Sequence, residues 1–163
     1  MRIPALLLSS AVVAGLCCAA LPAQARTEAM LQVNSDGRAN AKRNRLVLTS
    51  KASGGRDVMV VISCRVDDML TYGVALDFGA GAVWAVEGED VTISRDGGED
   101  IVQHMDSRDD YLTLGGSKAI GLFRQLLAGK SMAFAVKRKF TASFDLAQVE
   151  RHVSRFRQLC NPR

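Results

Sequence analysis

Two cysteines far apart in the chain constrain this fold more than any other feature of the sequence. Of the four cysteines, Cys17 and Cys18 lie in the N-terminal segment, whereas Cys64 lies in a β-branched run and Cys160 lies near the C-terminus. In an oxidising compartment an isolated pair of cysteines most often forms a disulfide. A Cys64–Cys160 bond would close a loop of roughly 100 residues and contribute about 4 kcal/mol in the chain-entropy model.

Residues 1–25 have the three parts of a secretory signal peptide. Arg2 supplies the positive start, residues 5–20 form an apolar run, and Ala23–Ala25 is a small-x-small cleavage site that leaves Arg26 at the new N-terminus. The alternative is a retained anchor, but a membrane span needs roughly 20 apolar residues. A lipoprotein signal is disfavoured because Leu16 stands directly before Cys17, and Cys17 directly before Cys18, where a small residue is expected. We therefore expect a periplasmic or secreted protein.

The hydrophobic periodicity around both cysteines places them on buried faces. In residues 58–66, which read as a strand, alternate positions form an apolar face. That face comprises Val58, Val60, Ile62, Cys64 and Val66. In residues 147–160, which read as a helix capped by Asp145, helical spacing aligns Val149, Val153, Phe156 and Cys160. The pattern predicts a disulfide from the last helical turn to a core strand, and the absence of a CxxC motif disfavours metal binding or redox catalysis.

Glycines and turn residues divide the chain into several strands and two helices. Runs with β propensity occur at residues 46–49, 58–66, 70–78, 82–86, 90–95, 101–105 and 111–114. Ser117 is a candidate cap for a helix over residues 118–128, which Gly129 ends. Residues 132–146 alternate in hydrophobicity except at 137–139, where we expect a bulge or turn. This order predicts an α+β fold, an antiparallel β-sheet or sandwich-like domain with two helices packed on it and one disulfide.

We expect three segments along the chain. Residues 1–25 form the signal peptide, residues 26–57 an N-terminal arm and first strand, and residues 58–163 the α+β core domain. The polar residues 26–44 read either as a loose arm or as a short leading hairpin, and a basic stretch with Arg43 and Arg45 lies nearby. Beyond the signal peptide no apolar run is long enough to span a bilayer, so no membrane attachment is expected after cleavage.

The charge balance argues against a nucleic-acid-binding protein. The formal net charge is +4, and signal cleavage removes Arg2 as the only charged residue. Nucleic-acid-binding domains usually concentrate far more positive charge on one face. The hydrophobic fraction of 48% and the charged fraction of 23% are typical of a globular domain.

No catalytic motif or metal-ligand pattern stands out in the sequence. G-x-S-x-G, HExxH and P-loop motifs are absent. The two histidines, His104 and His152, are each more typical of structural positions than of catalytic ones. We therefore predict no catalytic residue, no metal and no cofactor.

Two weaker patterns each have a simpler explanation. Residues 115–118 precede a helix and offer an anion site, but they lack the full phosphate-loop spacing. Calcium binding by Asp106, Asp109 and Asp110 is disfavoured, because Arg108 interrupts them and no spaced glutamate follows. A solvated turn explains these aspartates better.

A basic patch is the best candidate for a binding surface. It combines a cluster expected at a turn with arginines of the last predicted helix. Its members are Lys137, Arg138, Lys139, Arg151, Arg155 and Arg157. If the two elements are adjacent, the patch would face an acidic envelope protein or an anionic envelope polymer. The alternative is an ordinary solvated face.

Residues 58–160 resemble the C-terminal domain of periplasmic accessory proteins associated with type VI secretion (the VasI/TagO type). The marks are a strand ending in Cys64, a hairpin with Arg95-Asp96-Gly97, a helix ending at Gly129, Phe144-Asp145-Leu146, and a last helix closed by Cys160. The chain departs from that pattern, because residues 26–57 contain no cysteine and His104 stands near the place of an aromatic residue. The resemblance implies a disulfide-closed fold and a role beside a secretion apparatus.

The expected function is that of an exported, non-enzymatic accessory or binding protein of the cell envelope, associated with type VI secretion through the resemblance. Two alternatives stay open. One is an inhibitor or immunity protein directed against an envelope hydrolase. The other is a peptidoglycan-acting enzyme, for which Asp96, Glu99 and Asp100 form the one carboxylate cluster on offer. The sequence does not indicate an oligomeric state.

Overall fold

A computed structural model describes residues 26–35, 42–52, 55–66, 71–79, 82–137 and 140–160. The predicted signal peptide (residues 1–25) and two members of the predicted basic patch, Arg138 and Lys139, lie outside the described residues. No helix in the described ranges has the length and apolar character needed to span a membrane.

The described residues form nine strands and two α-helices. The first four strands are β1 (Glu28–Ser35), β2 (Lys42–Lys51), β3 (Asp57–Val66) and β4 (Thr71–Asp77). They are followed by β5 (Glu89–Arg95), β6 (Ile101–Arg108), β7 (Tyr111–Gly115) and α1 (Gly116–Ala128). The chain ends with β8 (Ser131–Val136), β9 (Phe140–Asp145), a short 3₁₀ turn (Ala147–Val149) and α2 (Glu150–Cys160). The predicted α+β fold is confirmed.

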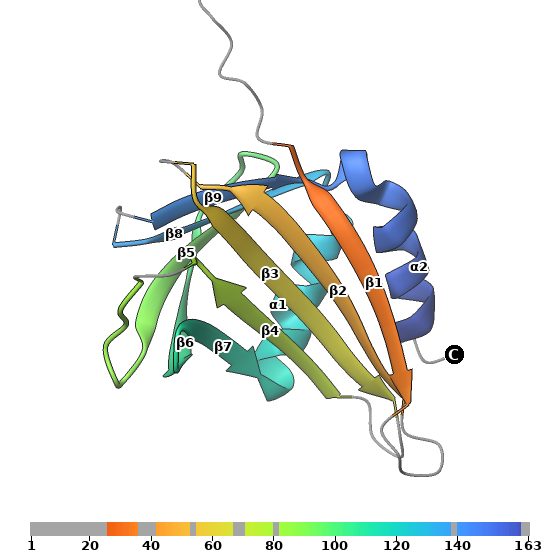
Figure 1. Cartoon of the computed structure of the whole chain (residues 1–163), viewed down its shortest axis with the longest axis horizontal. Helices are drawn as coiled ribbons and strands as arrows, with labels where there is room; N and C mark the ends of the chain where they lie inside the picture. Colours follow the sequence, from red (N-terminus) through yellow and green to blue (C-terminus); the bar gives the residue numbers. More distant parts are fainter. Residues whose placement is uncertain are drawn as a thin grey trace, which may run out of the picture.

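The strands form one antiparallel sheet that turns a corner at β6. The strand order is β1-β2-β3-β4-β7-β6-β5-β8-β9. The first part of β6, Ile101–Met105, pairs with β5, whereas Asp106–Arg108 pairs with β7. Strands β1 to β4 therefore run side by side, while β5, β8 and β9 lie behind them, toward the left of the view (Figure 1).

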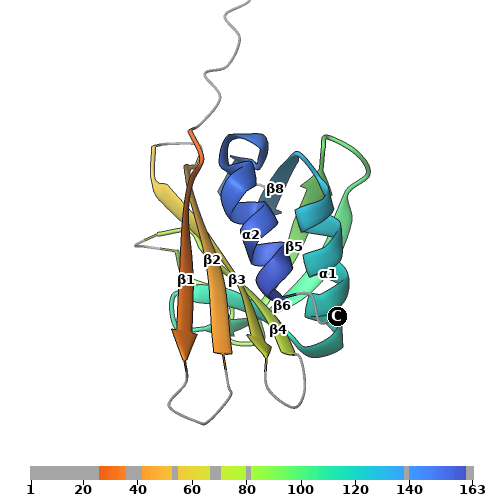
Figure 2. The same ribbon diagram turned by 90° about the vertical axis from the view of Figure 1, so that its right-hand side faces the viewer.

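Both helices lie on the inner face of the sheet. Figure 1 looks onto the outer face of β1 to β4, and after a quarter turn these strands lie on the left with α2 and α1 beside them (Figure 2). Helix α1 packs on β4 and β7, and α2 packs on β1, β2 and β3. The inner face is therefore the core side, and the outer face of these strands carries no helix.

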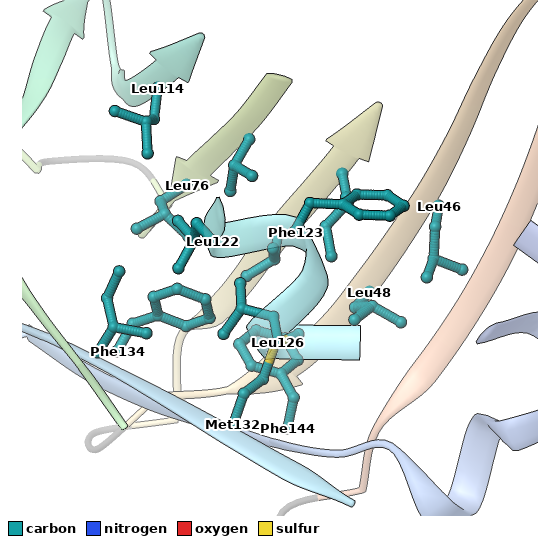
Figure 3. Close-up of a cluster of buried hydrophobic side chains, with 14 of the residues drawn as sticks. Leu46, Leu48, Leu76, Leu114, Leu122, Phe123, Leu126, Met132, Phe134 and Phe144 are labelled. Carbon is teal, nitrogen blue, oxygen red and sulfur yellow. The ribbon is translucent and has the colours of Figure 1, made fainter. Parts of the chain in front are cut away.

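Alternating side chains of the strands fill the space under the helices. Leu122 and Leu126 of α1 lie among sheet side chains that include Leu76 and Met132 (Figure 3). Each fully buried side chain of this size contributes roughly 1.5–3 kcal/mol relative to an exposed one. The alternation predicted for residues 132–146 holds, because β8 and β9 form a hairpin and Lys137 takes a left-handed φ of 50° at its turn.

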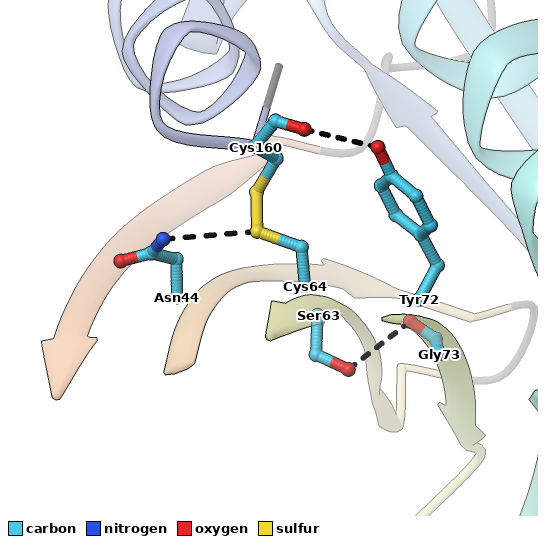
Figure 4. The surroundings of a disulfide bond; sticks show 6 residues. All are labelled: Asn44, Ser63, Cys64, Tyr72, Gly73 and Cys160. Carbon is cyan, nitrogen blue, oxygen red and sulfur yellow. Dashed lines mark hydrogen bonds between the residues drawn. A yellow bond between two sulfur atoms is a disulfide. The ribbon is translucent and has the colours of Figure 1, made fainter. Parts of the chain in front are cut away.

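The disulfide joins the core strand to the last helix as predicted. Cys64 on β3 and Cys160 at the end of α2 are bonded, with their Cα atoms 5.8 Å apart. The phenol of Tyr72 donates a hydrogen bond of 2.9 Å to the carbonyl of Cys160, and Asn44 Nδ2 lies 3.7 Å from Cys64 Sγ (Figure 4). The last turn of α2 is thus held by one covalent bond and one hydrogen bond.

Aromatic rings extend this connection to α1. The ring centroids of Tyr72 and Phe123 are 4.5 Å apart, and those of Phe123 and Phe156 are 5.8 Å apart. Tilted rings at these separations attract beyond their buried area. Strand β4, α1 and α2 therefore meet in one aromatic contact beside the disulfide.

Three local predictions differ from the structure. Residues 82–86 form no strand, because Trp84 turns inward to stack on Phe78 and Phe140 and donates its Nε1–H to the Asp110 carbonyl at 3.0 Å. Ser117 does not cap α1, because the helix already begins at Gly116. Its N-cap residue is Gly115, and no side chain makes a cap hydrogen bond there. The helix predicted over residues 147–160 is a 3₁₀ turn followed by α2, and the N-cap position of that turn is Leu146 rather than Asp145. The carboxylate of Asp145 accepts a hydrogen bond of 3.0 Å from the N–H of Ala147 at the start of the turn.

The N-terminal segment contributes more to the sheet than an arm would. Strand β1 pairs with β2 along its whole length, from Glu28↔Thr49 to Ser35↔Lys42. Thr27 Oγ1 also accepts a hydrogen bond of 2.8 Å from the N–H of Asp145. The hairpin alternative therefore describes residues 28–35 and 42–51 better than the loose arm.

Replacing both Cys64 and Cys160 with alanine is expected to lower the free energy of unfolding by about 4 kcal/mol, because the unfolded chain regains the freedom that the crosslink removes. Urea unfolding followed by circular dichroism measures this change. The wild-type protein unfolded in the presence of a thiol reductant is the control, and it should move toward the double variant. An unchanged urea midpoint for the double variant would contradict the role given to the bond.

Candidate functional site

The predicted basic patch is not assembled as one surface by the described residues. Lys137 directly follows β8, which lies on the left of Figure 1, whereas α2 lies on the right. Lys137 Nζ donates a 2.6 Å hydrogen bond to Glu89, whose side chain is only 7% exposed. This bond, with a second from the N–H of Ala85, lowers the pKa of Glu89. The charge of Lys137 therefore takes part in an ion pair with Glu89 within the fold.

The arginines of α2 remain on the surface. Arg151 and Arg155 are exposed, Arg157 is half-buried, and Arg155 donates a 3.2 Å hydrogen bond to Gln158. These arginines lie on the solvent-facing side of α2, next to its buried stripe of Val153, Phe156 and Cys160. Because strand β9 separates this helix from the β8–β9 turn in the chain and in space, Lys137 cannot join them.

The carboxylates considered for catalysis are divided between structural and solvated positions. Asp96 takes a left-handed φ of 54°, and its Oδ1 accepts hydrogen bonds from the N–H groups of Lys130 and Ser131 at 2.7 and 2.8 Å. These backbone bonds hold the pKa of Asp96 below its usual range, led by the bond from Ser131. Glu99 and Asp100 are exposed in the loop that follows. Asp96 therefore ties the β5–β6 turn to the start of β8 and is poorly suited to act as a general acid.

The three aspartates considered for calcium do not converge. Asp106 lies on β6, whereas Asp109 and Asp110 form the two-residue turn between β6 and β7. Among the residues that the structure describes, no group of three or more histidine, cysteine or acidic side chains is placed to hold a metal ion. Residues 115–118 begin α1 without a side-chain cap, and nothing else in their surroundings indicates an anion there.

His104 contacts two acceptors within the fold. Its Nδ1 lies 2.9 Å from Asp90 Oδ1, and its Nε2 lies 2.9 Å from the carbonyl oxygen of Glu87. Both neighbours are acceptors, so the ring satisfies them fully only as the imidazolium. The bond to Asp90, followed by that to Glu87, raises the pKa of His104. His152 is half-buried on α2, beside its buried stripe.

A groove on the outer face of the sheet was not predicted from the sequence. It has a volume of about 650 Å³ and runs over β3, β4 and β7. The strand register places small residues side by side on its floor. One row across the sheet is Ser63, Gly73 and Gly115, and the next is Val61, Ala75 and Thr113. With so few bulky side chains on central strands, the floor is hollowed.

Larger side chains stand at the border of this groove. Met59, Asp77, Tyr111 and Arg108 lie in one register row at one border. Arg45 stands at the opposite border, opposite Ser63. The groove thus offers apolar contact, an aromatic ring and charges of both signs, which suits recognition of an extended ligand.

The basic border of the groove continues into a smaller hollow of about 250 Å³. Arg43, Arg45 and Arg65 line it, and all three are half-buried. Arg43 and Arg65 lie directly opposite each other on β2 and β3. Arg65 was on the outward face of the strand predicted over residues 58–66, whereas Arg43 and Arg45 lay in a basic stretch before the strand predicted at 46–49. The cluster was missed because the pairing of these segments was not known.

A second hollow, of about 350 Å³, lies on the outer face of β5, β8 and β9. Its walls are mainly small side chains such as Thr92, Ala135 and Thr141, which are register partners. The residues that line it include no cluster of like charges. It is therefore a suitable place for a control substitution.

Comparisons with family models, curated proteins and solved structures found no match to this chain. The relationship to type VI secretion accessory proteins therefore stays a hypothesis, supported by the sequence marks alone.

Replacing Asp90 with asparagine is expected to lower the pKa of His104 toward its ordinary value, because the main partner of the imidazolium is lost. His104 stabilises the native state below about pH 6.5, and this contribution is lost as the pH rises through the raised native pKa. An NMR titration of His104 measures the shift, with Glu99→Gln as the charge-matched control. Equal titration midpoints in wild type and Asp90→Asn would contradict the assignment.

Proposed function

We propose that this chain is an exported, non-enzymatic binding protein of the cell envelope that holds its partner on the outer face of β3, β4 and β7. The observation that carries the proposal is the groove of about 650 Å³, with its floor of small side chains and its charged and aromatic borders. Binding sites are commonly hollows with a few well-placed polar groups. The inner face of the sheet is filled by the core and the two helices.

The crosslink supports the export part of this proposal. The Cys64–Cys160 bond closes the fold, and structural disulfides persist in oxidising compartments such as the periplasm or the extracellular space. The signal-peptide pattern of residues 1–25 leads to the same expectation. We therefore propose a periplasmic or secreted location.

The non-enzymatic part is supported by how the candidate catalytic groups are used. Both ring nitrogens of His104 are engaged by Asp90 and Glu87. The Oδ1 of Asp96 is occupied by donors from Lys130 and Ser131. None of these groups lines the groove. Of the two carboxylates that do line it, Asp77 accepts a hydrogen bond of 2.7 Å from the N–H of Gly79.

The role beside a type VI secretion apparatus is the narrower form of the proposal, and it follows from the sequence resemblance. It predicts that deletion of the gene reduces type VI secretion and that expression of the chain restores it. An inhibitor of an envelope hydrolase would use the same groove, and one tight complex with a single hydrolase would identify that alternative.

Replacing Ala75 with tryptophan is expected to reduce retention of the exported protein by envelope material about tenfold, the effect of about 1.4 kcal/mol. The indole would stand on the groove floor between Val61 and Thr113. Co-sedimentation of the purified exported protein with an envelope fraction, including intact sacculi, measures retention.

The matched control is Ala135→Trp, which places the same side chain on a central strand in the second hollow. Both variants should keep the thermal midpoint of the wild type within a few degrees. Equal retention of both variants would exclude the groove as the docking surface. Release of soluble fragments from sacculi by the wild-type protein would favour the enzymatic alternative instead.

A further inference from the structure

The arginines at the basic border form a distinct feature of the groove. Arg43 and Arg65 face each other across β2 and β3, and Arg45 follows on the same face of β2, one residue pair closer to the groove. Cross-strand partners have Cβ atoms about 4.5–5.5 Å apart, and like charges in such pairs repel each other. Because the three side chains are half-buried, water screens this repulsion less than it would on an open surface.

We propose that Arg43, Arg45 and Arg65 form a recognition site for the oxyanion group, carboxylate or phosphate, of an acidic envelope polysaccharide lying in the groove. This inference rests on the proposed function, because it names the ligand class of the same groove. A guanidinium presents five N–H donors in a planar fork that matches both oxyanions. An anion bound among three such forks offsets their mutual repulsion and gains charge-assisted hydrogen bonds.

The arginines do not contribute equally to the proposed site. Arg43 and Arg65 each also make an interaction within the chain. Arg45 makes no hydrogen bond or ion pair within the described part of the chain, and it lines both the small hollow and the groove. Arg45 is therefore the side chain that connects a bound oxyanion with the rest of the ligand.

The groove beyond Arg45 favours a polysaccharide over an acidic peptide. The two hollows share Ser63 and Gly73, so a ligand can continue from the arginines across the small-residue floor. At its far side the groove carries the carboxylates of Asp77 and Asp106. Carboxylates accept hydrogen bonds from sugar hydroxyls but repel the further negative charges of an acidic peptide.

The shape of the groove fits the same ligand class. Tyr111 and Met59 provide apolar surface at the border, against which the faces of sugar rings can pack. The floor over Gly73, Ala75 and Gly115 is low enough for an extended chain to lie along it. One anionic end and a hydroxyl-rich body would thus meet complementary sides of the groove.

Isothermal titration calorimetry with defined probes tests the proposal on the purified exported protein. The probes are a dextran oligosaccharide that ends in a single carboxylate, the same oligosaccharide ending in a single phosphate, neutral dextran, and poly-glutamate for an acidic peptide. We expect one of the two anionic probes to bind and neutral dextran not to bind. The anionic probe that binds identifies the recognised oxyanion as carboxylate or phosphate. Binding should weaken with added salt.

The variant Arg45→Gln should weaken this binding about tenfold or more, since a hydrogen bond to a charged group contributes about 1.5–3 kcal/mol. Arg45→Lys keeps the positive charge but not the planar set of donors, so its affinity should lie between those of the wild type and Arg45→Gln. Arg151→Gln on α2 is the matched control, because it removes the same charge from an exposed position away from the groove. Unchanged thermal midpoints establish that each variant is folded.

Equal binding by Arg45→Gln and the wild type, or an equal loss in Arg151→Gln, would overturn the inference. Tighter binding of poly-glutamate than of either polysaccharide would replace the polysaccharide with an acidic protein. If Ala75→Trp abolishes envelope retention while Arg45→Gln binds as well as wild type, the groove remains the docking surface and only the oxyanion assignment fails. If neither variant changes retention, the proposed function fails as well.

Discussion

The covalent link between β3 and the last turn of α2 is the constraint on which the rest of the structure depends. It fixes the C-terminal end of α2 over the strand that pairs with both β2 and β4. Tyr72 holds the same turn through the Cys160 carbonyl, and its ring contacts Phe123 of α1. A chain with one core and few residues gains much of its stability from such a link, because the unfolded state loses the freedom of a long loop.

The placement of both helices on one face determines where a ligand can bind. The concave side of the sheet is closed by α1, α2 and their apolar stripes, so the outward-facing side chains of the central strands remain accessible (Figure 2). On β4 and β7 those positions are Gly73, Ala75, Thr113 and Gly115. Small residues there leave the sheet uncovered and hollowed, whereas larger ones stand at the border. The same alternation that builds the core therefore also builds the groove.

The parts of the fold that depend on local pattern could be predicted from the sequence. Alternation placed Cys64 on an inner face, and helical spacing placed Cys160 on a buried stripe. The groove could not be predicted, because it depends on β4 pairing with β7, its distant neighbour in the chain. The position of Lys137 could not be predicted for the same reason, because Lys137 contacts Glu89 through the pairing of β8 with β5 and not the arginines of α2. The local sequence pattern predicts on which face of a strand each side chain lies, but it does not predict which strands pair with each other.

Peptide mapping of the exported protein by mass spectrometry, with free thiols alkylated before digestion and no reductant added, tests the central claim most directly. If the bond forms, one crosslinked species will contain the peptides around Cys64 and Cys160. This species will disappear on reduction. Recovery of both peptides alkylated, with no crosslinked species, would show that α2 is held by packing alone and would contradict the account.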